Sequence, residues 1–514
     1  MSDTKKSLTA CGTASTEQTT AQKRRVLLFY ANRERQPWPV MPIGLCHVAS
    51  ALKSWGHEVT IVDLMFERQW SQRVQSEIIR FAPDVIGISV RNIDNVDWFE
   101  TRTYLTPIRD EVVRPARAVS KAPIIIGGPA VNIAPTRLCA FLDVDYAVYG
   151  DGDGEGSIGP LVDALAAGVA PAAIPGVLRG NDDPGQPNRR PNLEGLVAAN
   201  IHRWIDVKPY ARAGSPYSVQ TKRGCAFNCS FCVYGAIEGR AYRLRDPEAI
   251  ADEIETANRE AGVRCFEFTD SVFNHPLGHA LDVCKAIIRR KLAITLNTTG
   301  VNPRYLTPEL LQLMAEAGFE ELSLAPDSAA PAVLAELGKG YTSPDVLVKA
   351  AQMIRDQKLP VAWWFSFGLP GETARSVEQT LAFIRDQVRP SDLVLATVGL
   401  RILPGTRLAA TALEEGKLSA DQDVLVPVFY EPTGISLADI HKQCTAAGRK
   451  LPNFLLSTDT RSLDAFLPIG IMLKRIFRHR QPLWRIVPPV NRLRNLLRRL
   501  PRFRRAVVMA PASS

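Results

Sequence analysis

The stretch Thr221-Lys-Arg-Gly-Cys225-Ala-Phe-Asn-Cys229-Ser-Phe-Cys232 places three cysteines on one short loop. They are separated by three residues and then by two, and an aromatic residue, Phe231, precedes the last cysteine. Thiolates spaced in this way can each bind one iron of a [4Fe–4S] cube and leave the fourth iron without a cysteine from the loop. We therefore predict that Cys225, Cys229 and Cys232 are metal ligands and that the remaining iron is open to chemistry.

Two other interpretations of the cysteines fit the sequence less well. A structural zinc ion takes a closed set of four ligands, usually two paired motifs, and no second pair of this kind occurs in the chain. Disulfides are disfavoured because nine cysteines in 514 residues, without a secretory segment, are typical of a reducing compartment.

The length and composition indicate a protein of several domains. A chain of 514 residues with 46% hydrophobic content is too long for one core and predicts two or three. Residues 1–24 lack an apolar run and are expected to be unstructured. Neither a signal peptide nor an apolar stretch of about 18 residues is found, so we expect a cytoplasmic protein.

The net charge of +9 belongs to one end of the chain. Residues 474–505 contain 12 Lys or Arg and no Asp or Glu, which leaves 50 basic and 53 acidic residues elsewhere. The body of the protein is therefore slightly acidic, and the charge gives no reason to predict nucleic-acid binding.

The first part of the chain, residues 25–179, predicts an α/β domain with a doubly wound parallel sheet. Short Val- and Ile-rich runs alternate with helical patterns, which is typical of parallel strands covered on both faces. The expected strands are residues 26–30, 57–63, 84–90, 123–128 and 146–150, and the first helix is residues 43–55.

A ligand of such a sheet binds beyond the carboxyl ends of the strands, where Ser89, Gly127 and Gly128 lie. No GxGxxG motif follows the first strand, so a dinucleotide is not predicted. The acidic run at residues 151–156 has the spacing of a calcium loop, but its twelfth position is Val162 rather than glutamate.

A linker at residues 180–214, rich at first in turn-forming residues, leads to a second domain at residues 215–415. Six strand and helix units there predict a partial (β/α)6 barrel, whose chemistry is expected at the carboxyl ends of the strands. The strands are residues 217–221, 265–270, 293–297, 321–325, 361–367 and 393–402. The polar and glycine positions at this rim are Asp270, Asn297, Asp327, Ser328 and Gly368.

Three other predictions concern the barrel and the end of the chain. Trp363 and Trp364 are adjacent on one strand, so at most one of them points inward. Cys265 and Cys284 fit buried packing positions. Residues 416–514 predict a small, mainly helical region with a basic amphipathic tail, which would contact a membrane surface, hold an anionic substrate or cover the barrel.

The cysteine loop resembles that of the radical S-adenosylmethionine superfamily, and the barrel agrees with it. The resemblance implies that S-adenosylmethionine chelates the open iron and is cleaved to a 5′-deoxyadenosyl radical. It also implies cofactor contacts from Asp327 and Ser328, since residues 327–329 stand where that family has a Glu-Ser-Gly run, and from Gly368, which opens a Gly-x-Pro-Gly-Glu-Thr run. We expect further contacts from Phe231, Asp270 and Asn297.

The first domain resembles the cobalamin-binding domain that precedes the radical domain in one large subfamily. The resemblance rests on Pro-Ile-Gly-Leu at 42–45, Gly-His-Glu-Val at 56–59, Gly-Ile-Ser at 87–89, Gly127 with Gly128, and the acidic glycine turn after Tyr149. It implies a cobalamin site that includes Ser89, Gly127 and Gly128.

The DxHxxG motif that supplies a histidine to cobalt in other cobalamin proteins is absent, and His57 is expected to be structural. The loop that contains Arg91 and Asn92 is then expected near the lower face of the cobalamin. The alternative for Arg91 is a surface ion pair with Asp94 or Asp97.

The resemblance implies a cobalamin-dependent radical S-adenosylmethionine methyltransferase that acts on an unactivated carbon, or a phosphorus, of a small molecule. Methylcobalamin would supply the methyl group, and a flavodoxin or ferredoxin would supply electrons. The alternatives are a cobalamin-dependent enzyme that closes or rearranges a ring without methylation and, from another class, a cobalamin-binding sensor. A sensor has no need of an open-iron cluster.

Overall fold

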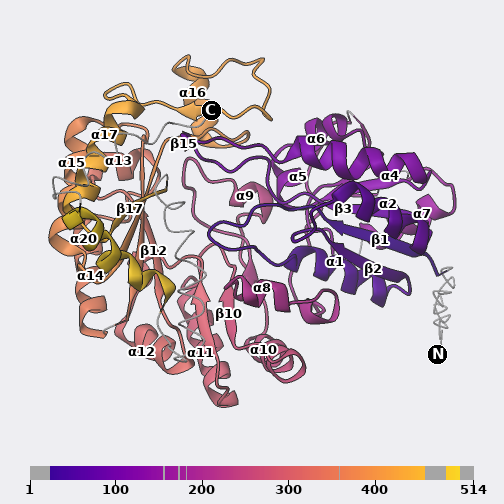
Figure 1. Cartoon of the computed structure of the whole chain (residues 1–514), viewed down its shortest axis with the longest axis horizontal. Coiled ribbons are helices and arrows are strands. Elements are labelled where there is room, and N and C mark those ends of the chain that lie inside the picture. Colours follow the sequence, from indigo (N-terminus) through magenta and orange to yellow (C-terminus); the bar gives the residue numbers. More distant parts are fainter. Residues whose placement is uncertain are drawn as a thin grey trace, which may run out of the picture.

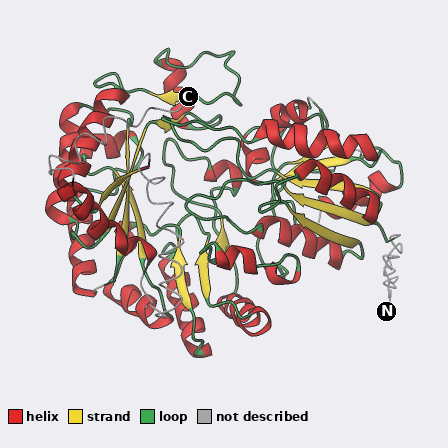
Figure 2. Cartoon of the chain, in the orientation of Figure 1, coloured by secondary structure: helices red, strands yellow, loops and turns green. Residues whose placement is uncertain are grey.

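The computed structural model describes residues 23–153, 157–171, 174–180, 182–357, 359–457 and 482–497. They form two α/β units, with the first sheet on one side of the molecule and an open barrel on the other (Figure 1). Helices cover both faces of the first sheet and the outer side of the barrel, and loops fill the region between the units (Figure 2). The predicted disorder of residues 1–24 concerns a segment that lies almost wholly outside the described residues.

The first sheet has the strand order β2-β1-β3-β4-β5-β6. Its first five strands are parallel, as predicted, and the short edge strand β6 pairs with β5 in the antiparallel direction. Alternate residues of β1 enter different cores, because Val26 and Leu28 face one layer of helices while Leu27 and Phe29 face the other. The strands are β1 Arg25–Tyr30, β2 Glu58–Asp63, β3 Val85–Ser89, β4 Ile124–Gly127, β5 Tyr146–Val148 and β6 Val177–Leu178.

Helices pack on both faces of this sheet, as its continuous apolar strands require. Apolar residues of α1 and α7 share a core with Val26 and Leu28, and those of α2, η1 and α6 share a core with Leu27 and Phe29. The helices are α1 Ile43–Ser54, α2 Trp70–Phe81, α3 Leu105–Ile108, η1 Arg109–Val113, α4 Arg114–Val119, α5 Pro129–Ile133, α6 Pro135–Leu142 and α7 Ile158–Ala166.

The barrel consists of two parallel groups of strands, β7-β10-β11 and β12-β13-β14-β17. Parallel bridges from Leu296 to Phe319 and from Val301 to Leu324 join the groups. The six predicted strands are present, and β17 from the C-terminal region extends the wall. The strands are β7 Tyr217–Val219, β10 Cys265–Phe268, β11 Thr295–Thr298, β12 Leu322–Asp327, β13 Val361–Phe367, β14 Leu393–Val398 and β17 Phe454–Leu456.

Helices follow the barrel strands on its outer side (Figure 1). The principal ones are α10 Pro247–Ala261, α11 Leu277–Arg290, α12 Pro308–Ala317, α14 Pro344–Gln357, α15 Ala374–Gln387 and α17 Leu437–Lys450. The unit also contains smaller helices, of which α9 lies on the side that faces the first unit (Figure 1); they are η2 Ile201–Arg203, α8 Lys208–Arg212, α9 Tyr234–Ile237, η3 Pro303–Tyr305, α13 Pro331–Glu336 and α16 Arg407–Glu414. Short pairs are formed by β8 Lys222–Arg223 with β9 Arg243–Leu244, and by β15 Leu400–Arg401 with β16 Phe429–Tyr430.

The end of the described chain packs on the barrel. The segment η5 Leu483–Ile486 leads into α20 Val487–Leu497, and Val487 is buried with Ala362, Leu393 and Leu455. Of the functions weighed for the tail, covering the barrel is compatible with this packing. The basic residues at 474–481 and after 497 lie outside the described residues.

The two units share one apolar core. Residues of α1 and α7 belong to the same buried cluster as Tyr210, Tyr217 and the inner residues of α10 and α11. Burial of a continuous apolar interface holds the units in one arrangement. Across the parts of the chain that the structure describes, no helix combines the length and apolar character needed to cross a membrane.

Candidate functional site

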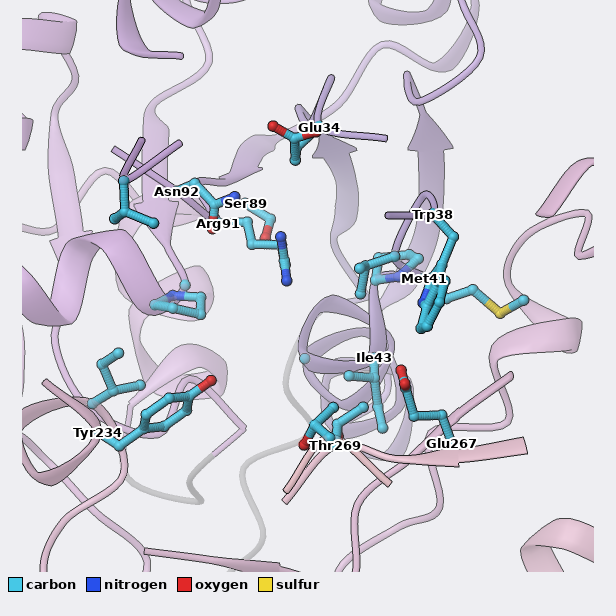
Figure 3. A pocket seen from close by; sticks show the side chains of 18 of the residues that line it. Glu34, Trp38, Met41, Ile43, Ser89, Arg91, Asn92, Tyr234, Glu267 and Thr269 are labelled. Atoms are coloured by element: carbon cyan, nitrogen blue, oxygen red, sulfur yellow. The ribbon is translucent and has the colours of Figure 1, made fainter. Parts of the chain in front are cut away.

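A cavity of about 1350 Å³ lies where the carboxyl edge of the first sheet faces the interior of the barrel. Its wall on one side includes Ser89, Arg91 and Gly128, and on the other side it includes Tyr234 and Asn297. Figure 3 shows side chains of the two units directed into one space. The edge of a parallel sheet and the rim of a barrel, each the usual ligand site of its fold, thus form a single site.

The sheet edge fits a large flat ligand. Ser89, Gly127 and Gly128 line the cavity, as the sequence predicted. Gly128 has φ +108°, and a Cβ atom at this position would lie 2.8 Å from the carbonyl oxygen of Val90. A side chain is therefore excluded where the backbone meets the cavity. This surface is compatible with cobalamin.

Arg91 reaches into the cavity from the loop after β3, beside Asn92 (Figure 3). The predicted alternative, an ion pair of Arg91 with Asp94 or Asp97, is not formed among the described residues. The carboxylate of Asp94 lies 3.0 Å from Nε of Arg401, and that of Asp97 accepts hydrogen bonds from the amides of Phe99 and Glu100. No histidine is found among the described residues that line the cavity. His57, expected to be structural, is buried outside it and lies 3.7 Å from Asp163.

The cysteine loop is held by main-chain bonds at its start and its middle. The amide of Cys225 donates to the carbonyl of Gly239, and the amide of Ser230 donates to the carbonyl of Leu337. Gly224 has φ +94°, and a Cβ atom there would lie 2.1 Å from the carbonyl oxygen of Ala241. Glycine is therefore required immediately before the first cysteine.

The three thiols gather at one place. Burial raises the pKa of Cys232 to about 12, and the nearby Cys229 and Cys225 act in the same direction. Within the described residues, no three Cys, His, Asp or Glu side chains surround a single ion position. A [4Fe–4S] cube does not need one, since each thiolate binds a different iron. The loop therefore fits the predicted cluster.

A lysine that the sequence did not single out lies beside the thiols. Lys339 Nζ forms an ion pair with Asp327, a predicted cofactor residue that lines the cavity, and lies 3.1 Å from the carbonyl oxygen of Ala325. Its positive charge lowers the pKa of Cys229, although burial of that thiol raises it. Lys339 thus supplies positive charge where a cluster with thiolate ligands would be negative.

The predicted rim residues divide into two groups. Asn297 and Asp327 line the cavity, whereas Phe231, Asp270, Ser328 and Gly368 are not among its lining residues. Asn297 Oδ1 is buried and has no hydrogen-bond partner in the described part of the protein.

The prediction for Asp270 is not supported by its position. Its carboxylate accepts hydrogen bonds from the main-chain amide of Thr221 at 2.8 Å and from Lys222 Nζ at 3.3 Å. The side chain is 1% exposed. Asp270 therefore anchors the strand that leads into the cysteine loop and has no free face for a cofactor.

The other three residues have packing or backbone roles. Ser328 is buried and bonds to Thr380, and the amide of Gly368 donates to Glu372. Phe231 packs against Leu337 and Leu369. The predicted rim residues thus include side chains that face the cavity and side chains that support its wall, and the sequence pattern did not separate the two.

Two further details concern the barrel interior. Trp364 lines the cavity and donates from Nε1 to Ser323 Oγ at 2.8 Å, whereas Trp363 is buried, so one tryptophan faces inward as predicted. Cys284 is buried, as expected, but Cys265 lines the cavity. The prediction for Cys265 was wrong because alternate residues of β10 face the interior.

Buried ion pairs join the two units beside the cavity. Arg223, two residues before Cys225, makes two hydrogen bonds of 2.7 and 2.8 Å to Asp153 of the first unit. Arg243 pairs with Asp151 of the same turn. The acidic turn that resembles a calcium loop thus binds arginines. Sequence reasoning missed these partners because they lie 70 or more positions away.

Comparisons with known proteins agree with this arrangement. Residues 38–156 match the family model of the B12 binding domain, and residues 219–384 match that of the radical SAM superfamily. The chain belongs to the cobalamin-dependent radical S-adenosylmethionine family. The two matches cover the sheet with its cavity edge and the barrel with its cysteine loop.

Two relatives and one solved structure illustrate the extent of the similarity within this family. An uncharacterised methyltransferase of Pyrococcus horikoshii is 27% identical over 385 residues, which span 73% of this chain and 79% of the relative. Tryptophan 2-C-methyltransferase of Streptomyces laurentii is 25% identical, and the match spans 73% of this chain and 73% of the relative. The structure of the methyltransferase TsrM from Kitasatospora setae, with cobalamin and a [4Fe–4S] cluster bound, is 26% identical with a TM-score of 0.68, covering 82% of this chain and 84% of that one.

Proposed function

We propose that this protein methylates a carbon, or a phosphorus, of a small molecule by means of cobalamin and S-adenosylmethionine. The observation that supports this proposal is the shared cavity, which is lined by the sheet edge on one side and by the barrel on the other. A sensor needs a cobalamin surface but has no use for a cysteine loop at the same cavity. The relatives whose match spans 73% of this chain include methyltransferases.

We assign each cofactor to residues that the structure brings together. Cys225, Cys229 and Cys232 would hold the cluster, with Asp327 and Lys339 beside it. Ser89, Gly127 and Gly128 would receive cobalamin, and Arg91 with Asn92 would lie near it in place of a histidine. When bound, the cluster and S-adenosylmethionine supply a carbon radical, and cobalamin carries the methyl group.

The C-terminal region forms part of the cavity wall. Trp484 of η5 donates a hydrogen bond to Glu321, and both residues line the far end of the cavity. Val487 covers apolar residues of β14 and β17.

Two partners follow from the chemistry. Reduction of the cluster needs a one-electron donor, for which we propose a flavodoxin or ferredoxin.

We place the protein in the cytoplasm, where thiols stay reduced. The basic residues beyond the described chain have the charge to contact an anionic membrane surface.

The test uses anaerobically reconstituted protein, a reductant, S-adenosylmethionine with a deuterated methyl group, and a small-molecule extract of the native host. We expect equal amounts of 5′-deoxyadenosine and S-adenosylhomocysteine, and a product that carries the label. Deoxyadenosine without homocysteine would instead support ring formation, and homocysteine alone would indicate methyl transfer without a substrate radical.

A further inference from the structure

The carboxylate of Glu267 faces the cavity from the middle of the barrel strand β10. Cys265 and Glu267 line the cavity, whereas Phe266 and Phe268 between and after them are fully buried in the core. This is the alternation of a strand with one face toward the interior. Glu267 is thus built into the barrel wall, and its direction is fixed by β10.

Glu267 meets the first unit across the cavity. The carboxylate lies near Trp38, from the segment that leads into α1, and near Ile43, the first residue of α1 (Figure 3). The Trp38 indole is within hydrogen-bonding reach of it. Glu267 of β10 is paired in register with Asn297 of β11, and Asn297 lines the same cavity. Both residues therefore offer oxygen acceptors to a ligand held between the two units.

The charge around Glu267 favours a cationic ligand. The barrel residues that line the cavity from β10 onward include the carboxylates Glu267, Glu320, Glu321 and Asp327 but no described lysine, arginine or histidine, whereas the arginines of the described lining, Arg91, Arg102 and Arg223, lie earlier in the chain. Asp327 is paired with Lys339, and Glu321 accepts a hydrogen bond from Trp484. Glu267 is 7% exposed, and no ion pair of it occurs among the described residues.

The titration of Glu267 agrees with this environment. Burial, together with the charge of Glu321 on β12, raises its pKa to about 7, while Trp38 and Arg91 act in the opposite direction. The carboxylate is therefore poorly stabilised in the absence of a ligand. A positive charge beside it would favour the ionised form.

Building on the proposed function, we propose that Glu267 binds the protonated amino group of the substrate, so that the substrate is an amine. Glu267 would form a charge-assisted hydrogen bond with the ammonium group, and Asn297 would lie beside it. This role differs from those of the cysteine loop and the sheet edge, because it concerns which molecule enters the space between them.

The test measures binding and does not depend on methyl transfer. Protein loaded with cluster and cobalamin is titrated with tryptamine, tyramine and agmatine, and with neutral counterparts in which a hydroxyl or a hydrogen replaces the amine. We expect at least one amine to bind wild-type protein more tightly than its counterpart. In Glu267→Gln, this preference should fall about tenfold or more, since the amide keeps the size and the acceptor oxygen but loses the charge.

The dependence on pH gives a second readout. The amines remain protonated between about pH 6 and about pH 8, whereas Glu267 passes from mainly neutral to mainly ionised. Amine affinity should therefore rise over this range in wild-type protein and stay level in Glu267→Gln. The control Glu316→Gln makes the same change on the exposed side of α12 and should behave as wild type.

Several results would overturn the proposal. One is that wild-type protein binds amines and their neutral counterparts equally well, or binds neither. Another is that wild type and Glu267→Gln bind amines with equal affinity. Loss of cobalamin or of S-adenosylmethionine binding in Glu267→Gln, without a change in amine preference, would assign the carboxylate to a cofactor. Methylation without amine preference would refute this inference and leave the proposed function intact.

Discussion

Gly128 combines two constraints on the backbone at the edge of the first sheet. Its φ of +108° disfavours any side chain, and the carbonyl of Val90 occupies the space that a Cβ atom would need. Gly56, at the end of the first helix, has nearly the same φ of +105° but no atom within 4 Å of such a Cβ. The two positions therefore share the torsional strain and differ in the close contact.

This comparison predicts the effect of substitution to alanine. Gly128→Ala should lose cobalamin on gel filtration and be destabilised more than Gly56→Ala, which should lose about 1 kcal/mol through its torsion alone. Absorbance of the retained cobalamin and urea unfolding measure the two effects. Equal behaviour of the two variants would show that the contact with Val90 is relieved by a local shift.

A second prediction at the residue scale concerns the metal of the cobalamin. No histidine lines the described cavity, and Arg91 is directed into it. The electron paramagnetic resonance spectrum of the cob(II)alamin form should therefore lack the splitting that a protein nitrogen ligand produces. A split signal that disappears in His57→Ala or His47→Ala would contradict the assignment.

At the scale of elements, a turn of the first unit is tied to the strand before the cysteine loop. Burial raises the pKa of Asp153, but the charge and hydrogen bonds of Arg223 more than offset it, so the pKa lies below its usual value. The carboxylate is therefore ionised throughout the neutral range. Its pairing fixes the spacing between the acidic turn and Cys225.

Removal of one partner should be costly. Asp153→Asn leaves Arg223 buried without its bidentate acceptor and should lower the free energy of unfolding by about 3–5 kcal/mol. The control is Asp423→Asn, which breaks the pair of Asp423 with Arg137, also between the units but with side chains 39% and 50% exposed. This loss should stay below about 1 kcal/mol. Urea unfolding measures both, and similar losses would refute the structural role of the buried pair.

The sequence predicted some features of these elements and not others. Runs of Val and Ile defined the parallel strands because each is buried on both faces, and the spacing of three cysteines identified their loop. Asp153 with Arg223, and Asp94 with Arg401, were beyond prediction because their partners meet only after folding. Glu267 was detectable in principle, since a carboxylate between Phe266 and Phe268 marks the inner face of a strand.

For the whole molecule, the decisive feature is the way the two units share a cavity. The sequence predicted a ligand site at the carboxyl edge of the sheet and chemistry at the carboxyl rim of the barrel, and in the structure residues of both line one space. Strand β17 was not predicted, and the helix that forms α20 was predicted without its packing partners. Neither segment carries a sequence motif. Their packing is decided by the apolar surface that the barrel leaves uncovered.

The measurement that tests the account most directly is metal analysis of anaerobically reconstituted protein and of its triple variant Cys225→Ala, Cys229→Ala, Cys232→Ala. We predict iron and cobalt in a ratio of about four to one in the wild type, and loss of iron with retention of cobalt in the variant. The claim that one chain binds both cofactors would be contradicted if iron persisted in the variant, or if the wild-type protein bound one metal without the other.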